Sequence, residues 1–222
     1  MYGRGYKFKS PDSREGVYGE ELAGHRMIIG VTGSFGTGKT TVAKMFAAKG
    51  AKILDADKLA HLALKKGTPT HKKIVLYFKK EGVLNKDGLV DKRKLAKAVF
   101  GNRKKLKRLT GIIQPFVIKK IKDFVRQMGR KGTIVIDAPL LIEAGLHKMV
   151  DKLIVVKADR KTQLLRCIKK KNFKKEEVIA RIKNQMPLAR KMKMADYVID
   201  NNGNLADTKK QVGKIWREIK WI

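Results

Sequence analysis

Residues 33–40 of the chain read GSFGTGKT, which fits the pattern G-x-x-x-x-G-K-[ST] of a phosphate-binding loop. The apolar run MIIGV at residues 27–31 comes directly before it, and a stretch with Val42, Phe46 and Ala47 on one helical face follows. A chance match in an ordinary glycine-containing loop would lack a strand on one side and a helix on the other. The stretch therefore predicts a nucleotide phosphate site after the first strand of an α/β domain.

The residues of this loop have separate tasks in the predicted site. The backbone N–H groups of a glycine-rich turn point inward at an anion, and the dipole of the following helix adds to the attraction. Lys39 is placed to reach the β- and γ-phosphates of ATP, and the Thr40 hydroxyl is placed to hold Mg²⁺. The predicted cofactors are ATP and Mg²⁺, and the predicted cofactor-binding residues of the loop are Gly33, Phe35, Gly36, Thr37, Gly38, Lys39 and Thr40.

Composition limits the class of protein. The chain has 222 residues, 43% of them hydrophobic, which is enough for one domain with an insertion and a buried core. No apolar run approaches the ~20 residues of a membrane helix, so we expect no membrane partner. Cys167 is the only cysteine, which excludes an internal disulfide and fits a cytoplasmic protein. The four histidines lack the spacing of a zinc site.

The formal net charge of +33 is the second strong feature of the sequence. Such a surface attracts phosphates or nucleic acid, but a lysine-rich proteome or a thermophilic surface explains it equally well. Aromatic residues are few and are not spaced as a base-stacking platform. We therefore expect nucleic-acid binding to be nonspecific, if it occurs at all, and we expect a monomer.

Short β-branched runs alternate with helical patterns along the chain. Strands are predicted at residues 27–32, 51–54, 133–137, 152–156 and 197–200. Helices are predicted at residues 40–49, 58–65, 69–80, 92–100, 103–113, 115–128, 160–170, 175–194 and 207–220. This order predicts an α/β fold of three layers, with a five-stranded parallel sheet covered by helices on both faces.

The connection between the second and third predicted strands is far longer than the ~12 residues that a crossover needs. Its excess predicts a helical acceptor-binding insertion at about residues 58–131, at the carboxyl edge of the sheet. Basic helices at about residues 160–194 predict a lid over phosphates, although an ordinary solvated surface explains them too. Residues 1–26 are polar and rich in glycine, and we expect a disordered extension before a single domain at 27–222.

Three acidic residues are candidates for chemistry. Asp55 and Asp57 follow the second predicted strand, where the alternation of side chains would point both toward the phosphate loop. A carboxylate here can orient an acceptor hydroxyl and take its proton, a catalytic role that we assign to Asp57. The alternative is that Asp57 caps the helix predicted to begin at Lys58. Asp137 ends the third strand and, with Asp55, is a further candidate for binding Mg²⁺.

Four further motifs accompany the phosphate loop. They read DAD at residues 55–57, PLLIE at 139–143, RIKNQ at 181–185 and ADYVIDN at 195–201. In this order they resemble the motifs of the dephospho-CoA kinase family, and the resemblance runs from Met27 to about Trp221. It implies a P-loop kinase fold and ATP-dependent phosphorylation of the ribose 3′-hydroxyl of dephospho-CoA, the last step of coenzyme A synthesis.

The resemblance also implies roles for single residues. It places Asp57 near the acceptor hydroxyl. It makes Arg166 a lid arginine that acts in catalysis together with Lys39. It also extends the nucleotide site to Lys170 and Asn201. The family usually has a second lid arginine where this chain has Lys170. Lysine lacks the planar guanidinium with which arginine binds phosphate in a bidentate way.

A second departure from the family pattern lies in the insertion, where the usual His-Pro is Gln114-Pro115. Two other interpretations stay open at this point. One is a nucleoside or nucleotide monophosphate kinase on the same scaffold, and the other is a nucleic-acid-binding NTPase, which the net charge favours. The aspartates at 55 and 57 and the long insertion favour a small-molecule acceptor.

Overall fold

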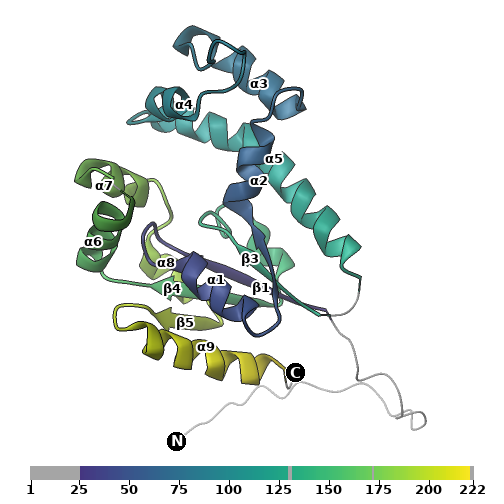
Figure 1. The fold of residues 1–222 in the computed structure, drawn as a ribbon, viewed down its shortest axis with the longest axis vertical. Helices are drawn as coiled ribbons and strands as arrows, with labels where there is room; N and C mark the ends of the chain where they lie inside the picture. Colours follow the sequence, from purple (N-terminus) through teal and green to yellow (C-terminus); the bar gives the residue numbers. More distant parts are fainter. Residues whose placement is uncertain (1–25, 130–131, 172, 221–222) are drawn as a thin grey trace, which may run out of the picture.

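A computed structural model of the chain describes residues 26–129, 132–171 and 173–220 (Figure 1). Except for Arg26, the extension predicted at 1–26 therefore lies outside the described residues. The elements are β1 (Met27–Gly33), α1 (Lys39–Ala47), β2 (Lys52–Asp55), α2 (Ala56–Ala63), α3 (Pro69–Tyr77), η1 (Lys79–Glu81), α4 (Lys92–Val99), α5 (Arg103–Gln127), β3 (Thr133–Asp137), η2 (Leu146–Met149), β4 (Lys152–Lys157), α6 (Arg160–Lys171), α7 (Lys175–Lys183), α8 (Leu188–Lys193), β5 (Tyr197–Asp200) and α9 (Leu205–Lys220).

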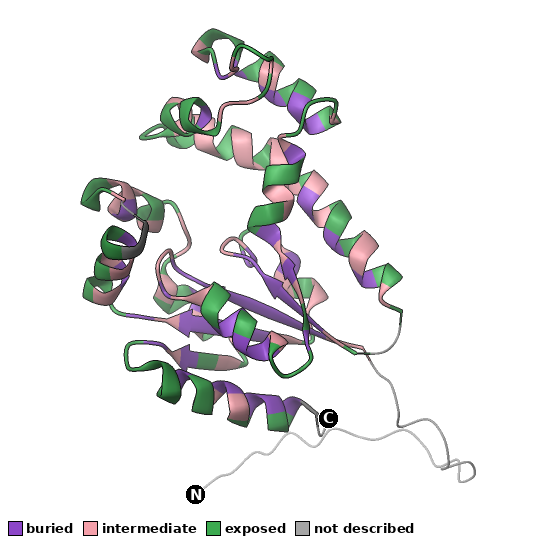
Figure 2. Cartoon of the chain, viewed as in Figure 1, coloured by how far each residue is buried: buried purple, intermediate pink, exposed green. Residues whose placement is uncertain are grey.

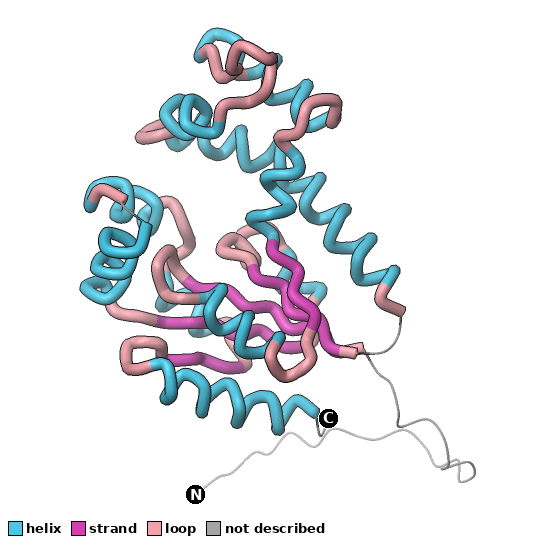
Figure 3. The backbone as a smooth tube through the Cα atoms, viewed as in Figure 1, coloured by secondary structure: helices cyan, strands magenta, loops and turns pink. Residues whose placement is uncertain are grey.

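The strands form one parallel sheet in the order β2-β3-β1-β4-β5, which confirms the five-stranded sheet expected from the sequence. In the register of β2 and β3, Asp55 pairs with Asp137. Because all strands run in one direction, their carboxyl ends share one edge. The loops that leave this edge lead to α1, to α2, to the segment after β3 and to α6 (Figure 3).

The alternation of apolar residues along the strands builds a core on each face of the sheet. Ile29 and Val31 of β1 pack on one face with Phe46 of α1 and with Trp216 of α9. Ile28 of the same strand faces the other side, in the core that includes α5. The layers are therefore α1 and α9, the sheet, and α5, which confirms the three-layer α/β fold. Buried residues concentrate in the strands (Figure 2).

The helices between β2 and β3 stand away from the sheet and have a core of their own. Ile74, Phe78, Val83 and Leu95 are buried together there. Helix α5 belongs to both parts of the molecule, since residues near its start, such as Leu109, pack in this small core while later residues pack on the sheet. The small helical part is thus joined to the sheet by two helices, α2 after β2 and the long α5 before β3 (Figure 1).

Two predicted helix boundaries are wrong. The helices predicted at 103–113 and 115–128 are the single helix α5, which runs through Pro115. Proline removes the hydrogen bond to the Gly111 carbonyl, but cores on both sides of Pro115 hold the helix together. The helix predicted at 175–194 is instead two helices, α7 and α8, because Pro187 lacks an N–H group and restricts the residue before it.

None of the described helices combines the length and the hydropathy that crossing a bilayer requires.

Candidate active site

The phosphate loop between β1 and α1 is braced from behind by Asn201. The buried Asn201 side chain donates from Nδ2 to the Thr37 carbonyl oxygen at 2.8 Å, and its Oδ1 accepts from the Thr208 hydroxyl at 2.8 Å. Gly38 has a φ of +91°, and a Cβ there would lie 2.2 Å from Asn201 Nδ2, so glycine alone fits. The protein itself therefore holds the loop in its curved shape.

The loop leads into a helix whose first N–H groups face outward at the site. Gly38 is the N-cap residue of α1, and its cap has no side-chain hydrogen bond. Uncapped N–H groups at the start of a helix attract anions. Lys39 Nζ lies 3.4 Å from the Ser34 carbonyl oxygen, within the same loop. The backbone N–H groups of the loop and the ammonium group of Lys39 thus lie in the same loop, as phosphate binding requires.

Helices α6 and α7 lie beside the loop (Figure 1). A Cβ at Gly36 would lie 2.8 Å from Cys167 Sγ, so α6 approaches the loop backbone closely. The Phe35 N–H donates to Gln185 Oε1 at 2.9 Å, and the Arg181 guanidinium lies 5.3 Å from the centre of the Phe35 ring. The phosphate loop is therefore in direct contact with the basic helical segment that follows β4.

Arg166 of α6 lies over the phosphate loop. A Cβ at Gly38 would lie 3.8 Å from Arg166 Nη1. This Nη1 is buried and has no hydrogen-bond partner among the described residues, although a buried donor without an acceptor is costly. A phosphate group in the loop would supply such an acceptor, in the geometry that a guanidinium favours. Lys170 lies in the same helix, but its side chain is outside the described part of the structure.

Thr40 and Asp137 meet at the end of β3. Thr40 Oγ1 donates to Asp137 Oδ2 at 2.7 Å. Burial raises the pKa of the Asp137 carboxyl group, and the hydrogen bond from Thr40 and the nearby charge of Lys39 oppose this rise. A hydroxyl and a carboxylate side by side fit Mg²⁺, which takes few protein oxygens and completes its shell with phosphate oxygens and water. The pair therefore suits the magnesium ion of a bound nucleotide.

The structure corrects the placement expected for Asp55 and Asp57. β2 ends at Asp55 and α2 begins at the next residue, so Asp57 lies in the first turn of a helix and the strand alternation does not reach it. Asp55 Oδ1 accepts from Lys58 N at 3.0 Å, so Asp55 makes the helix cap that was the alternative role for Asp57. Asp55 lies opposite Asp137 in the register of β2 and β3, and Asp57 lines a cavity together with Ala138, the residue after Asp137. Both carboxylates add to the rise that burial produces in the pKa of Asp137.

A cavity of about 150 Å³ lies beside Asp57, between α2, α5 and the segment after β3. Its polar lining consists of Asp57, Thr110 and Gln114, and apolar side chains such as Ile113 and Leu140 form the rest of its walls. A small apolar pocket with a few convergent polar groups is typical of a ligand site. Ala138 in its wall follows Asp137, which bonds Thr40, so we take this cavity and the phosphate loop together as the candidate site.

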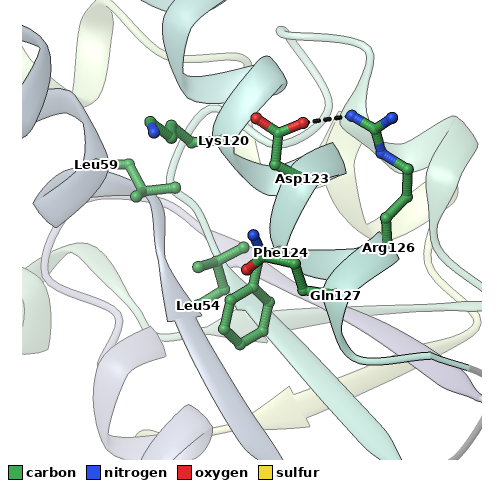
Figure 4. Close-up of a pocket in the computed structure, with 7 residues that line it drawn as sticks. All are labelled: Leu54, Leu59, Lys120, Asp123, Phe124, Arg126 and Gln127. Atoms are coloured by element: carbon green, nitrogen blue, oxygen red, sulfur yellow. Dashed lines mark hydrogen bonds and ion pairs between the residues drawn. The ribbon is translucent and has the colours of Figure 1, made fainter.

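A larger cavity, of about 560 Å³, lies between β2, α2 and the last turns of α5 (Figure 4). Leu54, Leu59 and Phe124 form its apolar part, and Asp123 is paired with Arg126 at its rim. None of the residues around it belongs to the phosphate loop or to the acidic group. We therefore place the candidate active site at the smaller cavity.

A fully buried ammonium group fixes the segment after β3. Lys191 Nζ of α8 donates to the Pro139 carbonyl oxygen at 2.7 Å and pairs with the Glu143 carboxylate at 2.9 Å. Burial lowers the pKa of Lys191, and the contacts with Glu143 oppose this shift. Glu143 also accepts from Met186 N at 2.9 Å. Pro139 lines the small cavity, so this contact ties one of its walls to α8.

Replacing Lys191 by methionine is expected to destabilise the protein by about 3 kcal/mol. Methionine fills a similar volume, but it leaves the Glu143 carboxylate and the Pro139 carbonyl without the buried cation that bonds both. Urea denaturation of Lys191→Met measures the loss. The exposed neighbour Lys193 gives the control, since Lys193→Met should stay within ~0.5 kcal/mol of the original. Equal stability of the two variants would show that the buried pair contributes nothing.

The structure gathers most of the predicted site residues. Lys39 and Thr40, the three aspartates and Arg166 surround the end of the phosphate loop, while Asn201 lies behind it. Gln185 was quoted in the RIKNQ motif but received no role from the sequence. Lys191 gave no signal, because lysines fill its neighbourhood and nothing in the pattern marks one of them as buried.

Comparison with known proteins gives one consistent result. The family model described as dephospho-CoA kinase matches residues 27–207. A dephospho-CoA kinase of Carboxydothermus hydrogenoformans is 41% identical over 196 residues, which cover 87% of this chain and 95% of that protein. One of Aquifex aeolicus is 42% identical over 191 residues, covering 86% and 96%. The solved structure of a dephospho-CoA kinase from Campylobacter jejuni matches with a TM-score of 0.64 and 28% identity, covering 88% of this chain and 98% of that one.

Proposed function

The chain belongs to the dephospho-CoA kinase family, whose members carry out the final, ATP-dependent step of coenzyme A biosynthesis, and from this premise we propose how its residues divide the work. ATP lies with its phosphates in the loop at 33–40, and dephospho-CoA binds at the cavity that Asp57 lines, with its ribose beside Asp57. The observation that carries this proposal is that Asp57 lines one cavity with Ala138, the residue after Asp137, whose carboxylate accepts a hydrogen bond from Thr40 of the phosphate loop.

Three side chains act on the reacting atoms in this proposal. Asp57 orients the 3′-hydroxyl and accepts its proton as the hydroxyl oxygen attacks the γ-phosphorus. The bond between this phosphorus and the bridging oxygen of ADP breaks. Lys39 and Arg166 neutralise the negative charge that develops on the transferred group, from the loop and from α6.

Thr40 and Asp137 would hold Mg²⁺, and Asp55 is close enough to contribute through water. When bound, the ion would supply positive charge that offsets the negative charge of the nucleotide phosphates. The carboxylate of Asp137 is held for this task by the Thr40 hydroxyl and by its place at the end of β3.

The helical parts complete the proposed division. The segment at about 58–131 is the acceptor-binding insertion, since α2 and α5 supply Asp57, Thr110 and Gln114 to the cavity. The lid consists of α6 and α7, which contact the phosphate loop. Helix α8, at the end of the range 160–194, packs against β4 and stays with the sheet.

The test is a comparison of acceptors with the purified protein and Mg-ATP. We expect ADP and coenzyme A to form together from dephospho-CoA, with little turnover of AMP or uridine. RNA should bind, if at all, in a salt-dependent and nonspecific way and should not stimulate ATP hydrolysis. Faster turnover of AMP or uridine, or an RNA-dependent ATPase activity, would overturn the proposal.

Arg166→Lys is expected to lower turnover about 10-fold. The substitution keeps the charge but removes the planar guanidinium that reaches two phosphate oxygens, and a hydrogen bond to a charged group contributes about 1.5–3 kcal/mol. Arg160 begins the same helix and is exposed, so Arg160→Lys is the matched control and should leave turnover unchanged. Steady-state turnover at fixed ionic strength measures both variants. Equal rates for both would mean that α6 is only a basic surface.

A further inference from the structure

Gln114 and Thr110 are the polar residues of the small cavity that have no role in the proposed chemistry, and of the two only Gln114 has a buried side-chain atom without a partner among the described residues. It lies in α5 just before Pro115 and lines the cavity that Asp57 also lines. Its Oε1 is buried and, within the described part of the chain, has no hydrogen-bond partner. A buried amide oxygen without a donor costs about 1–3 kcal/mol, so such atoms are commonly satisfied by a ligand.

The surroundings of Gln114 limit what this ligand group can be. The residues near it are mostly apolar, including Ile113, Val117 and Leu140. Pockets that enclose a whole drug-sized molecule measure ~300–1,000 Å³, whereas this cavity measures about 150 Å³. It therefore suits one moiety of the acceptor, flat and apolar on its faces and polar at its edge.

The acceptor carries such a moiety next to the reacting hydroxyl. Adenine is bonded to the same ribose whose 3′-hydroxyl is assigned to Asp57, so a residue that lines the same cavity is within reach of the base. The edge of adenine presents an amino donor beside a ring-nitrogen acceptor. A glutamine amide presents the complementary acceptor and donor, a pairing known from protein contacts with adenine.

We propose that Gln114 recognises the adenine of the acceptor, with Oε1 accepting from the 6-amino group and Nε2 donating to the ring nitrogen N7. The proposal rests on the function proposed above and adds base selectivity to it. Hypoxanthine, which has a carbonyl oxygen in place of the amino group, turns the donor into an acceptor. A site built to bond a donor rejects an analogue that lacks it, because its own buried acceptor is then left unpaired.

The experiment compares dephospho-CoA with its hypoxanthine analogue as acceptors. We expect the original protein to prefer the adenine acceptor in kcat/KM by about 10- to 100-fold, the discrimination that a bidentate amide contact gives. Gln114→Leu should lose most of this preference, chiefly through a higher KM for dephospho-CoA, while the KM for ATP stays the same. Gln114→Glu keeps the acceptor oxygen but cannot donate. Its preference for the adenine acceptor should therefore lie between those of the original protein and Gln114→Leu.

Gln127 provides the matched control, because it is an exposed glutamine of the same helix that lines the other cavity. Gln127→Leu should keep the full preference for adenine. If Gln114→Leu does not fold, Gln114→Glu carries the test. A preference unchanged in the folded Gln114 variants would overturn the inference while leaving the kinase activity intact. Absence of dephospho-CoA phosphorylation by the original protein would instead overturn the proposed function itself.

Discussion

The Lys39→Ala variant is expected to fold normally, and its turnover is expected to be about 10²- to 10³-fold lower than that of the original protein. Lys39 lies in the phosphate loop, and its ammonium group is the loop's cation for the β- and γ-phosphates. Removing one preorganised group that stabilises transition-state charge typically costs a factor of this size. The substitution leaves the loop backbone, its glycines and the bracing amide of Asn201 in place, so the loss should appear in the rate and not in stability.

Steady-state turnover with dephospho-CoA and thermal unfolding measure the two effects separately. Lys44 is an exposed lysine of the same helix, and Lys44→Ala should match the original protein in both. A well-folded Lys39→Ala protein with near-original turnover would refute the assignment of the phosphate loop.

Asp57→Asn is expected to lower turnover about 10²-fold or more at an unchanged melting temperature. Asparagine keeps the size of the side chain and its place in α2, but it cannot accept the proton of the acceptor hydroxyl. Because Asp55 makes the helix cap, the change at Asp57 leaves the cap intact. Stability should therefore be independent of the charge at Asp57.

The neighbouring aspartate serves as the comparison for stability. Asp55→Ala removes the cap on Lys58 N and should lower stability by about 1 kcal/mol. Parallel turnover and melting measurements on the two variants separate the catalytic carboxylate from the structural one. Full activity of Asp57→Asn would leave the proton of the acceptor hydroxyl without an identified base.

The parts of the structure that local pattern controls were predictable from the sequence. The phosphate loop, the five strands and their parallel order all follow from short apolar runs and the residues between them. The meeting of Thr40 with Asp137 follows too, because the carboxyl ends of neighbouring parallel strands lie together.

Features that depend on tertiary packing or on a shift of one residue were not predictable. Helix α5 continues through Pro115 because two separate cores hold its halves, and neither core can be recognised from the helix alone. The capping role belongs to Asp55 because α2 begins at Ala56, two residues earlier than predicted, and element ends are uncertain by a residue or two. The buried position of Lys191 depends on Glu143, 48 residues earlier in the chain.

The position of β1 in the sheet has a consequence for the synthesis of the chain. β1 is the central strand, and its two neighbours, β3 and β4, begin at residues 133 and 152. While the ribosome makes the residues in between, β1 has no strand to pair with, and Ile28 and Ile29 cannot enter the cores that they later share with β3 and β4. Contacts between such distant residues slow folding and prolong the exposure of apolar surface. In the nascent chain β1 therefore stays unpaired until β3 has left the ribosome, and one of its edges stays open and prone to aggregation until residue 157 has followed.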